Sequence, residues 1–199
     1  DPDILVARAS FLASQDKPQL AIEDFDRAID ADPKCAAAYN GRGALRANAL
    51  GEIDKALLDV IKAVDLEPNE PGFHFNLGSL RMKARLYMRA IESFDTALAL
   101  KGPAARIIER RAEAKSLIGD HVGARQDIDL ALEKDAQSAS GYAALGAIRL
   151  RAREYEQSVR DFSQALRLDD ASASAYARRG QAYGALGQLK AALADLRRA

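Results

Sequence analysis

The 199-residue sequence has one cysteine, no tryptophan, two histidines and no excess charge of either sign. The lone Cys35 excludes an internal disulfide and a zinc site built from several cysteines. Its 29 basic and 29 acidic residues cancel, so the chain as a whole has no attraction for nucleic acid or an anionic membrane. No apolar run approaches the roughly 18 residues of a membrane span. Nor does the sequence show a secretory signal pattern.

Motifs for catalysis, metals or cofactors are equally scarce. His74 and His121 lie far apart, which leaves a zinc motif or a histidine-based triad without partners; we expect His121 in a solvated turn. Residues 41–43, Gly-Arg-Gly, begin a dinucleotide-loop pattern but lack its third glycine, since Arg46 stands there. We therefore expect no enzyme, no metal and no cofactor.

The sequence has instead a strong self-similarity at a fixed period. Residues 139–172 read as two amphipathic helices joined by a short turn, because small and apolar residues recur three or four apart. Shifting this stretch by 34 residues, with a single step of 35, superposes one small position along the whole chain: Ala9, Gly43, Gly78, Ala112, Gly146 and Gly180. The chain is a tandem array.

Three more positions of the array are equally regular. A second small position holds Ala21, Ala56, Ala90, Ala124, Ser158 and Ala192, and a third holds Ala28, Ala63, Ala97, Ala131, Ala165 and Ala199. A large apolar position before the third holds Phe25, Val60, Phe94, Ile128, Phe162 and Leu196. This pattern resembles the tetratricopeptide repeat (TPR) family. The resemblance implies an all-α, right-handed superhelical α-solenoid of helix-turn-helix repeats.

The register divides residues 1–199 into one continuous array of six repeats. Their expected limits are approximately 2–35, 36–70, 71–104, 105–138, 139–172 and 173–199. Helices of the first repeat are expected near Asp3–Ser14 and Pro18–Asp30, and Gly102-Pro103 is expected to stop the third repeat. The one extra residue is expected in the turn between the helices of the second repeat, around Leu50 and Gly51.

Two repeats depart from the regular pattern. The fourth has Arg111 and Lys115 where large apolar residues are commoner, and we interpret this as functional specialisation. The last leaves Leu189, Leu193 and Leu196 facing solvent or a partner, which predicts either that further chain has been cut away or that the ends of two copies pair. Because the chain begins at Asp1 rather than Met, we expect an excised or processed product. Its compartment stays open: cytoplasmic, or periplasmic or secreted after loss of a signal peptide.

In this family the first helices of successive repeats line a concave groove that binds protein segments. The resemblance therefore implies a non-catalytic protein-protein interaction scaffold. The groove residues that we expect to select the partner are Asn40, Phe75, Asn76, Ser79, Lys83, Arg106, Glu109, Arg110 and Glu113. The groove places of the later repeats are Ala143, Ala147 and Arg151, then Ala177, Arg178 and Gln181. Those of the fifth repeat are mostly alanine, so we expect that repeat to matter less.

Charge suggests which partner the groove would bind. Residues 74–125 hold ten basic and five acidic side chains, whereas residues 1–34 hold four basic and eight acidic. A groove that is basic in its central repeats suits an acidic peptide. Basic residues without interleaved exposed aromatics make RNA the less favoured ligand.

One subset of the family captures a peptide's C-terminal carboxylate with five residues spread over three repeats. Asn76, Arg106 and Arg110 match that clamp, whereas Asn40 and Ala44 stand where Lys and Asn are expected. Two arginines four residues apart lie on one helix face and can bind a carboxylate together.

Two alternatives remain open from the residues alone. Arg106 and Arg110 can instead form ordinary ion pairs with Glu109 and Glu113 along their helix, each worth ~0.2–0.5 kcal/mol. The array can also be a regulatory or docking segment of a larger enzyme or assembly.

Overall fold

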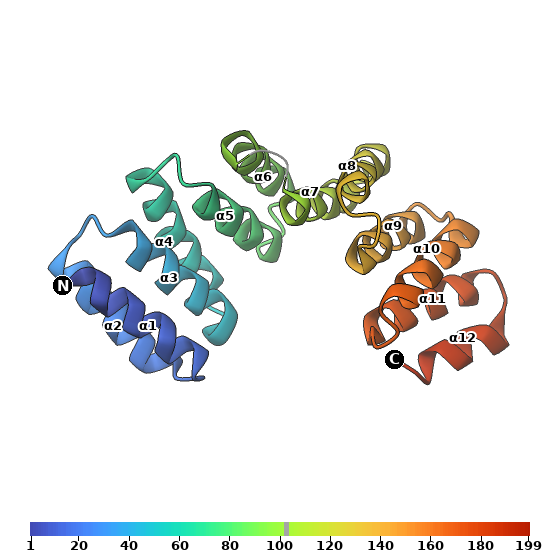
Figure 1. Cartoon of the computed structure of the whole chain (residues 1–199), viewed down its shortest axis with the longest axis horizontal. Helices are drawn as coiled ribbons and strands as arrows, with labels where there is room; N and C mark the ends of the chain where they lie inside the picture. The colour runs from blue at the N-terminus through green and yellow to red at the C-terminus, as the bar shows by residue number, and fades with distance from the viewer. Residues whose placement is uncertain (102–103) are drawn as a thin grey trace. The chain divides into compact units, whose positions relative to one another are not determined.

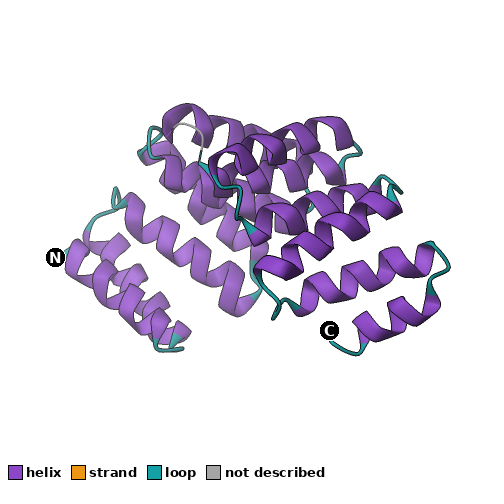
Figure 2. Cartoon of the chain, turned by 45° about the vertical axis from the view of Figure 1, so that its right-hand side comes forward, coloured by secondary structure: helices purple, strands orange, loops and turns teal. Residues whose placement is uncertain are grey.

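The computed structural model describes residues 1–101 and 104–199, and the regular elements within these two ranges are all helical (Figure 2). The expected all-α fold is confirmed. The chain divides into two compact units, Asp1–Gly102 and Pro103–Ala199, which we call the N-terminal and C-terminal units and describe separately. The predicted stop at Gly102 and Pro103 lies outside the described residues, and the single continuous array stays a prediction.

The N-terminal unit is a stack of helix pairs (Figure 1). Its helices are α1 (Pro2–Ser14), α2 (Pro18–Ala31), α3 (Ala36–Leu45), α4 (Ile53–Leu66), α5 (Pro71–Lys83) and α6 (Tyr87–Lys101), with a π-helix, η1 (Arg46–Leu50), after α3. Each pair packs on the next through α2 with α3 and α4 with α5. The first helices α1, α3 and α5 also contact one another in that order, as expected for stacked repeats.

The C-terminal unit repeats the arrangement. Its helices are α7 (Ala105–Leu117), α8 (His121–Lys134), α9 (Ala139–Arg151), α10 (Tyr155–Leu168), α11 (Ala173–Ala185) and α12 (Leu189–Leu196). Its first helices α7, α9 and α11 contact one another in order, so each unit presents a row of first helices. None of the helices in the described ranges is long and apolar enough to cross a membrane.

The predicted small positions are the points where helices touch. Those within helices are buried, and Ala9, Ala56 and Ala112 have no exposed surface at all. A Cβ added to Gly43 would lie 2.7 Å from Val60 Cγ2. The last member of the set, Ala199, lies beyond α12 and is exposed.

The extra residue of the second repeat is placed differently from the prediction. It does not lengthen the turn at Leu50 and Gly51; instead, the end of the first helix widens into the π-helix Arg46–Leu50. The Gly51 N–H donates a hydrogen bond to the Arg46 carbonyl, which closes this wider loop. A π-turn holds one more residue than an α-turn, so it absorbs the insertion inside the helix.

Every turn between the two helices of a repeat contains one residue with positive φ. The values run from 56° to 88° at Asp16, Gly51, Arg85, Gly119, Arg153 and Gly187. These positions follow the same 34- or 35-residue step as the small positions. Asp16, Arg85 and Arg153 hold the conformation although a side chain costs about 1–2 kcal/mol there. Tertiary packing therefore imposes this turn even where glycine is missing.

A buried carboxylate recurs on the second helix of five repeats, and an arginine from the first helix of the same repeat binds each one. The pairs are Arg8–Asp24, Arg42–Asp59, Arg111–Asp127, Arg149–Asp161 and Arg179–Asp195. In the third repeat a buried serine, Ser93, accepts a hydrogen bond of 2.7 Å from Arg81 instead. We call this series the Arg–Asp ladder, and it joins the two helices of a repeat.

The ladder changes the interpretation of the fourth repeat. Arg111 Nη2 lies 2.6 Å from Asp127 Oδ1, and Lys115 Nζ lies 2.9 Å from Asp127 Oδ2. These two cations, which we interpreted as functional specialisation, therefore hold the packing of α7 on α8. Members of the ladder differ in the direction of their pKa shift. Hydrogen bonding from Arg8 lowers the pKa of Asp24, whereas burial raises the pKa of Asp161 to about 6 against the opposing effect of Arg149.

Candidate functional site

The predicted groove residues all lie on first helices, but they are divided between the two units. Five are on α3 and α5, namely Asn40, Phe75, Asn76, Ser79 and Lys83, and four are on α7, namely Arg106, Glu109, Arg110 and Glu113. The C-terminal carboxylate clamp needs Asn76 together with Arg106 and Arg110. Its members therefore lie in separate units, and the clamp stays a prediction.

In the N-terminal unit, polar side chains connect α5 to α3 and the π-helix. Asn76 Nδ2 donates a hydrogen bond of 2.9 Å to Asn40 Oδ1, and Lys83 Nζ donates one of 2.7 Å to Asn48 Oδ1. The Phe75 ring is half-buried, with its centroid 5.9 Å from that of Phe94. Two of the predicted residues, Asn40 and Asn76, are thus brought into direct contact. Asn48 was not predicted, because it lies in the π-helix that the sequence did not reveal.

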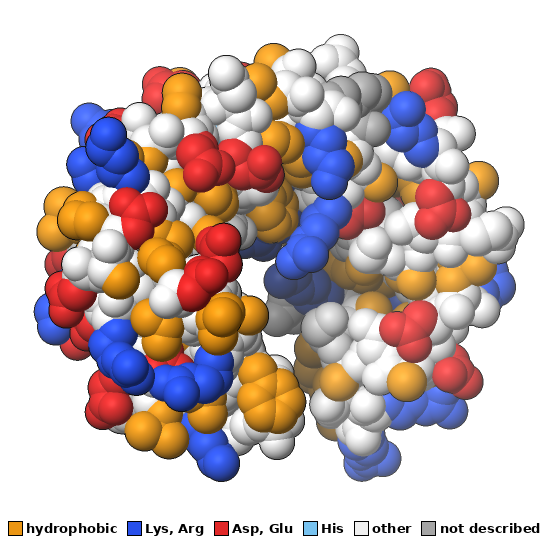
Figure 3. All heavy atoms as spheres, turned by 60° about the vertical axis from the view of Figure 1, so that its left-hand side comes forward, with side chains coloured by type: hydrophobic (Ala, Val, Ile, Leu, Met, Phe, Trp, Pro, Cys, Tyr) orange, Lys and Arg blue, Asp and Glu red, His pale blue; other side chains and the backbone are white. Residues whose placement is uncertain are grey.

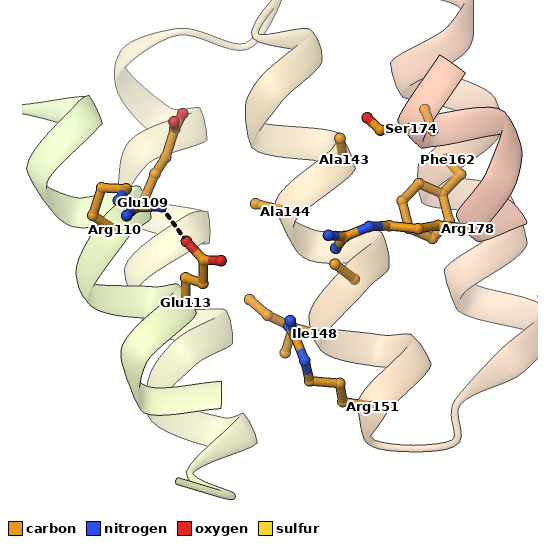
Figure 4. A pocket seen from close by; sticks show the side chains of 12 residues that line it. Glu109, Arg110, Glu113, Ala143, Ala144, Ile148, Arg151, Phe162, Ser174 and Arg178 are labelled. Atoms are coloured by element: carbon orange, nitrogen blue, oxygen red, sulfur yellow. Dashed lines mark hydrogen bonds and ion pairs between the residues drawn. The ribbon is translucent and has the colours of Figure 1, made fainter. Parts of the chain in front are cut away.

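In the C-terminal unit, the row of first helices encloses a hollow of about 260 Å³ (Figure 4). It is lined by Glu109, Arg110, Glu113, Ala143, Ala144, Ala147, Ile148, Arg151, Phe162, Ser174, Ala175 and Arg178. Alanines of α9 lie between the longer side chains of α7 and α11, and their short side chains leave the space open (Figure 4). We call this the alanine hollow.

The residues of the alanine hollow were expected along the groove, but with unequal importance. Glu109, Arg110 and Glu113 were expected to select the partner, whereas Ala143, Ala147, Arg151 and Arg178 were groove places without that role. The sequence feature that could have indicated the hollow is the small size of Ala143 and Ala147 at groove-facing places of a first helix. Small residues there create space, just as small residues at inward places allow close packing.

Ion pairs and hydrogen bonds order the α7 side of the hollow. Arg110 Nη1 lies 2.5 Å from Glu113 Oε2, so the alternative of an ion pair along the helix is confirmed for these two residues. Glu109 Oε1 accepts a hydrogen bond of 3.1 Å from Ser140 Oγ of α9. Arg106 is exposed at the start of the same helix.

The histidines and the cysteine are accounted for by packing. His74 is buried, and its Nε2 lies 2.8 Å from the Pro68 carbonyl oxygen, which confirms a packing role. His121 was expected in a solvated turn, but it is the half-buried first residue of α8 and its buried Nδ1 has no hydrogen-bond partner among the described residues. Cys35 is buried. Within the described part of the chain, no three His, Cys, Asp or Glu side chains are grouped to hold a metal ion.

The surface shows no large patch of one charge on the face in Figure 3. Lys and Arg side chains alternate there with Asp and Glu, and apolar side chains lie between them. The exposed apolar residues include Leu189, Leu193 and Leu196 of α12, which are 72%, 52% and 52% exposed. They face outward as expected; self-association through them stays a prediction.

Comparison with known proteins agrees with this helix-pair architecture. A tetratricopeptide repeat model matches residues 6–71 and 75–139, and a second matches residues 173–199. The chain belongs to the tetratricopeptide repeat family. TPR proteins generally act as protein-interaction scaffolds. No curated protein matches the sequence.

Several solved TPR structures share the fold at low sequence identity. PilW, a type IV pilus biogenesis factor, is 18% identical with a TM-score of 0.88, and the match covers 98% of this chain and 90% of PilW. A TPR protein from Parabacteroides merdae is 18% identical with a TM-score of 0.86, covering 98% of this chain and 77% of that one. YrrB, described as having an unusual peptide-binding site, is 18% identical with a TM-score of 0.62 and coverages of 87% and 89%.

Proposed function

We propose that this TPR chain is a non-catalytic protein-interaction module that binds an extended peptide segment across its first helices. The alanine hollow is the observation that carries the proposal. It has a volume of about 260 Å³ and adjoins a second hollow of about 420 Å³ that shares Ala147, Arg151 and Arg178. An open surface of this kind along three first helices suits several side chains of an extended peptide.

The polar contacts of the N-terminal unit support a separate binding surface within that unit. Asn40 and Asn76 share one hydrogen bond, which leaves the other donor and acceptor positions of both amides for a peptide backbone. Phe75 and Ser79 are half-buried on the same helix as Asn76, and Lys83 is exposed at its end. We expect this surface to bind the backbone of an extended peptide segment, and the ammonium group of Lys83 gives the surface a positive charge.

Capture of a C-terminal carboxylate by Arg106 and Arg110 is an alternative form of this proposal. Arg110 already binds Glu113, but the side chains of this pair are 36% and 38% exposed. Surface pairs of this kind are worth ~0–1 kcal/mol, so a ligand carboxylate can replace Glu113. Peptides with free and amidated C-termini test this part directly, since only the free form supplies a terminal carboxylate.

Selection from a phage-displayed library of random peptides tests whether the hollow binds at all. Ala143→Leu fills the hollow from its half-exposed floor, and we expect clones enriched on the natural chain to bind this variant at least tenfold more weakly. Ala194→Leu is the matched control, because Ala194 is exposed on α12 and outside the hollow. A library that yields no enriched clones, or clones that bind both variants equally, contradicts the proposed function.

A further inference from the structure

The two walls of the alanine hollow carry opposite charge. Glu109 and Glu113 stand on α7 together with Arg110, which is paired with Glu113, and Arg178 reaches from α11 toward α9 (Figure 4). The alanines of α9 lie between these walls, with Arg151 near one end of the same helix. The α7 wall therefore has one more carboxylate than it has cations, and the α11 wall has a cation. A ligand that crosses the three helices meets these surfaces in that order.

Arg178 is available to a ligand in a way that its neighbour is not. Arg179 donates to both carboxylate oxygens of Asp195, at 2.7 and 2.8 Å, and to Ser163 Oγ at 3.0 Å, as a member of the Arg–Asp ladder. Arg178 is exposed, lines the hollow, and forms no hydrogen bond or ion pair within the ranges that the structure describes. Its guanidinium can therefore bind a carboxylate with two parallel hydrogen bonds without breaking any existing contact.

The α7 wall offers carboxylate oxygens to a cation. Glu109 uses one oxygen for the Ser140 hydroxyl, which leaves the other oxygen for a donor. Glu113 is held by Arg110 in a half-exposed pair that a stronger partner can displace at small cost. A lysine or arginine of a ligand is the group that complements this wall.

Helix spacing sets the distance between the two charges of the ligand. First helices in contact lie about 8–10 Å apart, so α7 and α11 are separated by about 16–20 Å across α9. An extended chain advances roughly 3.3 Å per residue, so it spans this distance in about five or six residues.

We infer that the alanine hollow selects an internal protein segment with a basic residue on the α7 wall, small apolar residues over α9 and an acidic side chain on Arg178. This inference rests on the proposed function and adds the chemistry of the partner. We assign the acidic group to a side chain and not to the C-terminus of the ligand. An internal segment can contact the α7 wall and Arg178 and then continue past Arg178. A free C-terminus at the same place is an outcome of the test.

The test repeats the library selection with the natural chain and with Arg178→Glu. We expect clones from the natural chain to contain Asp or Glu about five or six residues from Lys or Arg, and Arg178→Glu to weaken their binding at least tenfold. Selection on Arg178→Glu should replace the acidic residue by Lys or Arg. Arg167→Glu is the control, since it makes the same charge change at an exposed position of α10 where Arg167 contacts Gln164.

The outcomes separate this inference from the proposed function. If Ala143→Leu abolishes binding but Arg178→Glu leaves both affinity and selected sequences unchanged, the hollow binds peptides and the charge order is wrong. Loss of binding on C-terminal amidation of the selected peptides contradicts an internal segment. Failure to enrich any clone contradicts the proposed function itself.

Discussion

Replacement of two helical glycines by alanine should change stability in opposite directions. A Cβ on Gly43 of α3 would lie 2.7 Å from Val60 Cγ2 and 2.9 Å from the Ala56 carbonyl oxygen of α4. The methyl of Val60 can turn aside, but the carbonyl belongs to helix backbone, so α3 must move away from α4. A Cβ on Gly184 of α11 meets nothing within 4 Å.

The expected magnitudes follow from two opposing effects. Overpacking costs about 1–3 kcal/mol, while alanine gains roughly 0.5–1 kcal/mol over glycine within a helix. Gly43→Ala should therefore lower the free energy of unfolding by about 0–2.5 kcal/mol. Gly184→Ala keeps only the gain and should raise it by roughly 0.5–1 kcal/mol.

Urea denaturation followed by circular dichroism measures the sign of both changes. Hydrogen exchange of α3–α4 and α11–α12 then shows whether each effect is local, because a repeat array transmits strain mainly to neighbouring repeats. Stability changes of the same sign for Gly43→Ala and Gly184→Ala would refute the assignment of the small positions to helix contacts.

Three further predictions concern the packing and the ladder. Gly146→Leu places a large side chain against the Phe162 ring, 3.0 Å from the nearest Cβ position, and should cost at least ~1–3 kcal/mol in the same denaturation assay. Asp59→Ala removes the carboxylate that Arg42 and Arg46 share, although Arg42 keeps its ion pair with Asp26, and should cost about 1–3 kcal/mol. A cost near zero would show that the ladder does not hold the helices. Burial raises the pKa of Asp161 from 3.8 to about 6, so the folded state binds the carboxyl proton more tightly than the unfolded state does. The stability that protonated Asp161 contributes is full below pH 3.8 and is lost as the pH rises through about 6. Asp161→Asn should remove that part of the pH dependence, and parallel urea midpoints of both proteins between pH 4 and 7 would contradict it.

The helices and their contacts could be predicted from the sequence because steric size controls them. Two helices approach to about 8–10 Å only where side chains are short, so positions such as Gly43, Gly78 and Ala112 have to be small wherever the repeat occurs. Their spacing fixed the register and the pairing of helices. The π-helix Arg46–Leu50 could not be predicted in the same way, because an insertion of one residue fits a turn and a widened helix end equally well.

The Arg–Asp ladder was missed although its acids recur with the period of the repeat. An acid on an amphipathic helix is normally assigned to the solvent face, and only the partner on another helix shows that it is buried. The importance of the alanine hollow was underestimated for a different reason. Ala143 and Ala147 carry no chemistry of their own, and their importance lies in the space between Glu109 and Arg178.

Arg178 and Arg179 show why residue type alone does not separate fold from function here. Successive residues of an α-helix point about 100° apart, so one arginine turns inward to Asp195 while the other turns to the hollow. The ladder arginines Arg8, Arg42, Arg111 and Arg179 each directly precede a small position of the repeat. Where leucine stands there, as at Leu77 and Leu145, the arginine appears one turn later, at Arg81 and Arg149. An arginine that fits neither place, such as Arg178, is not needed to join the helices of its repeat, and it is among such residues that partner selection should be sought.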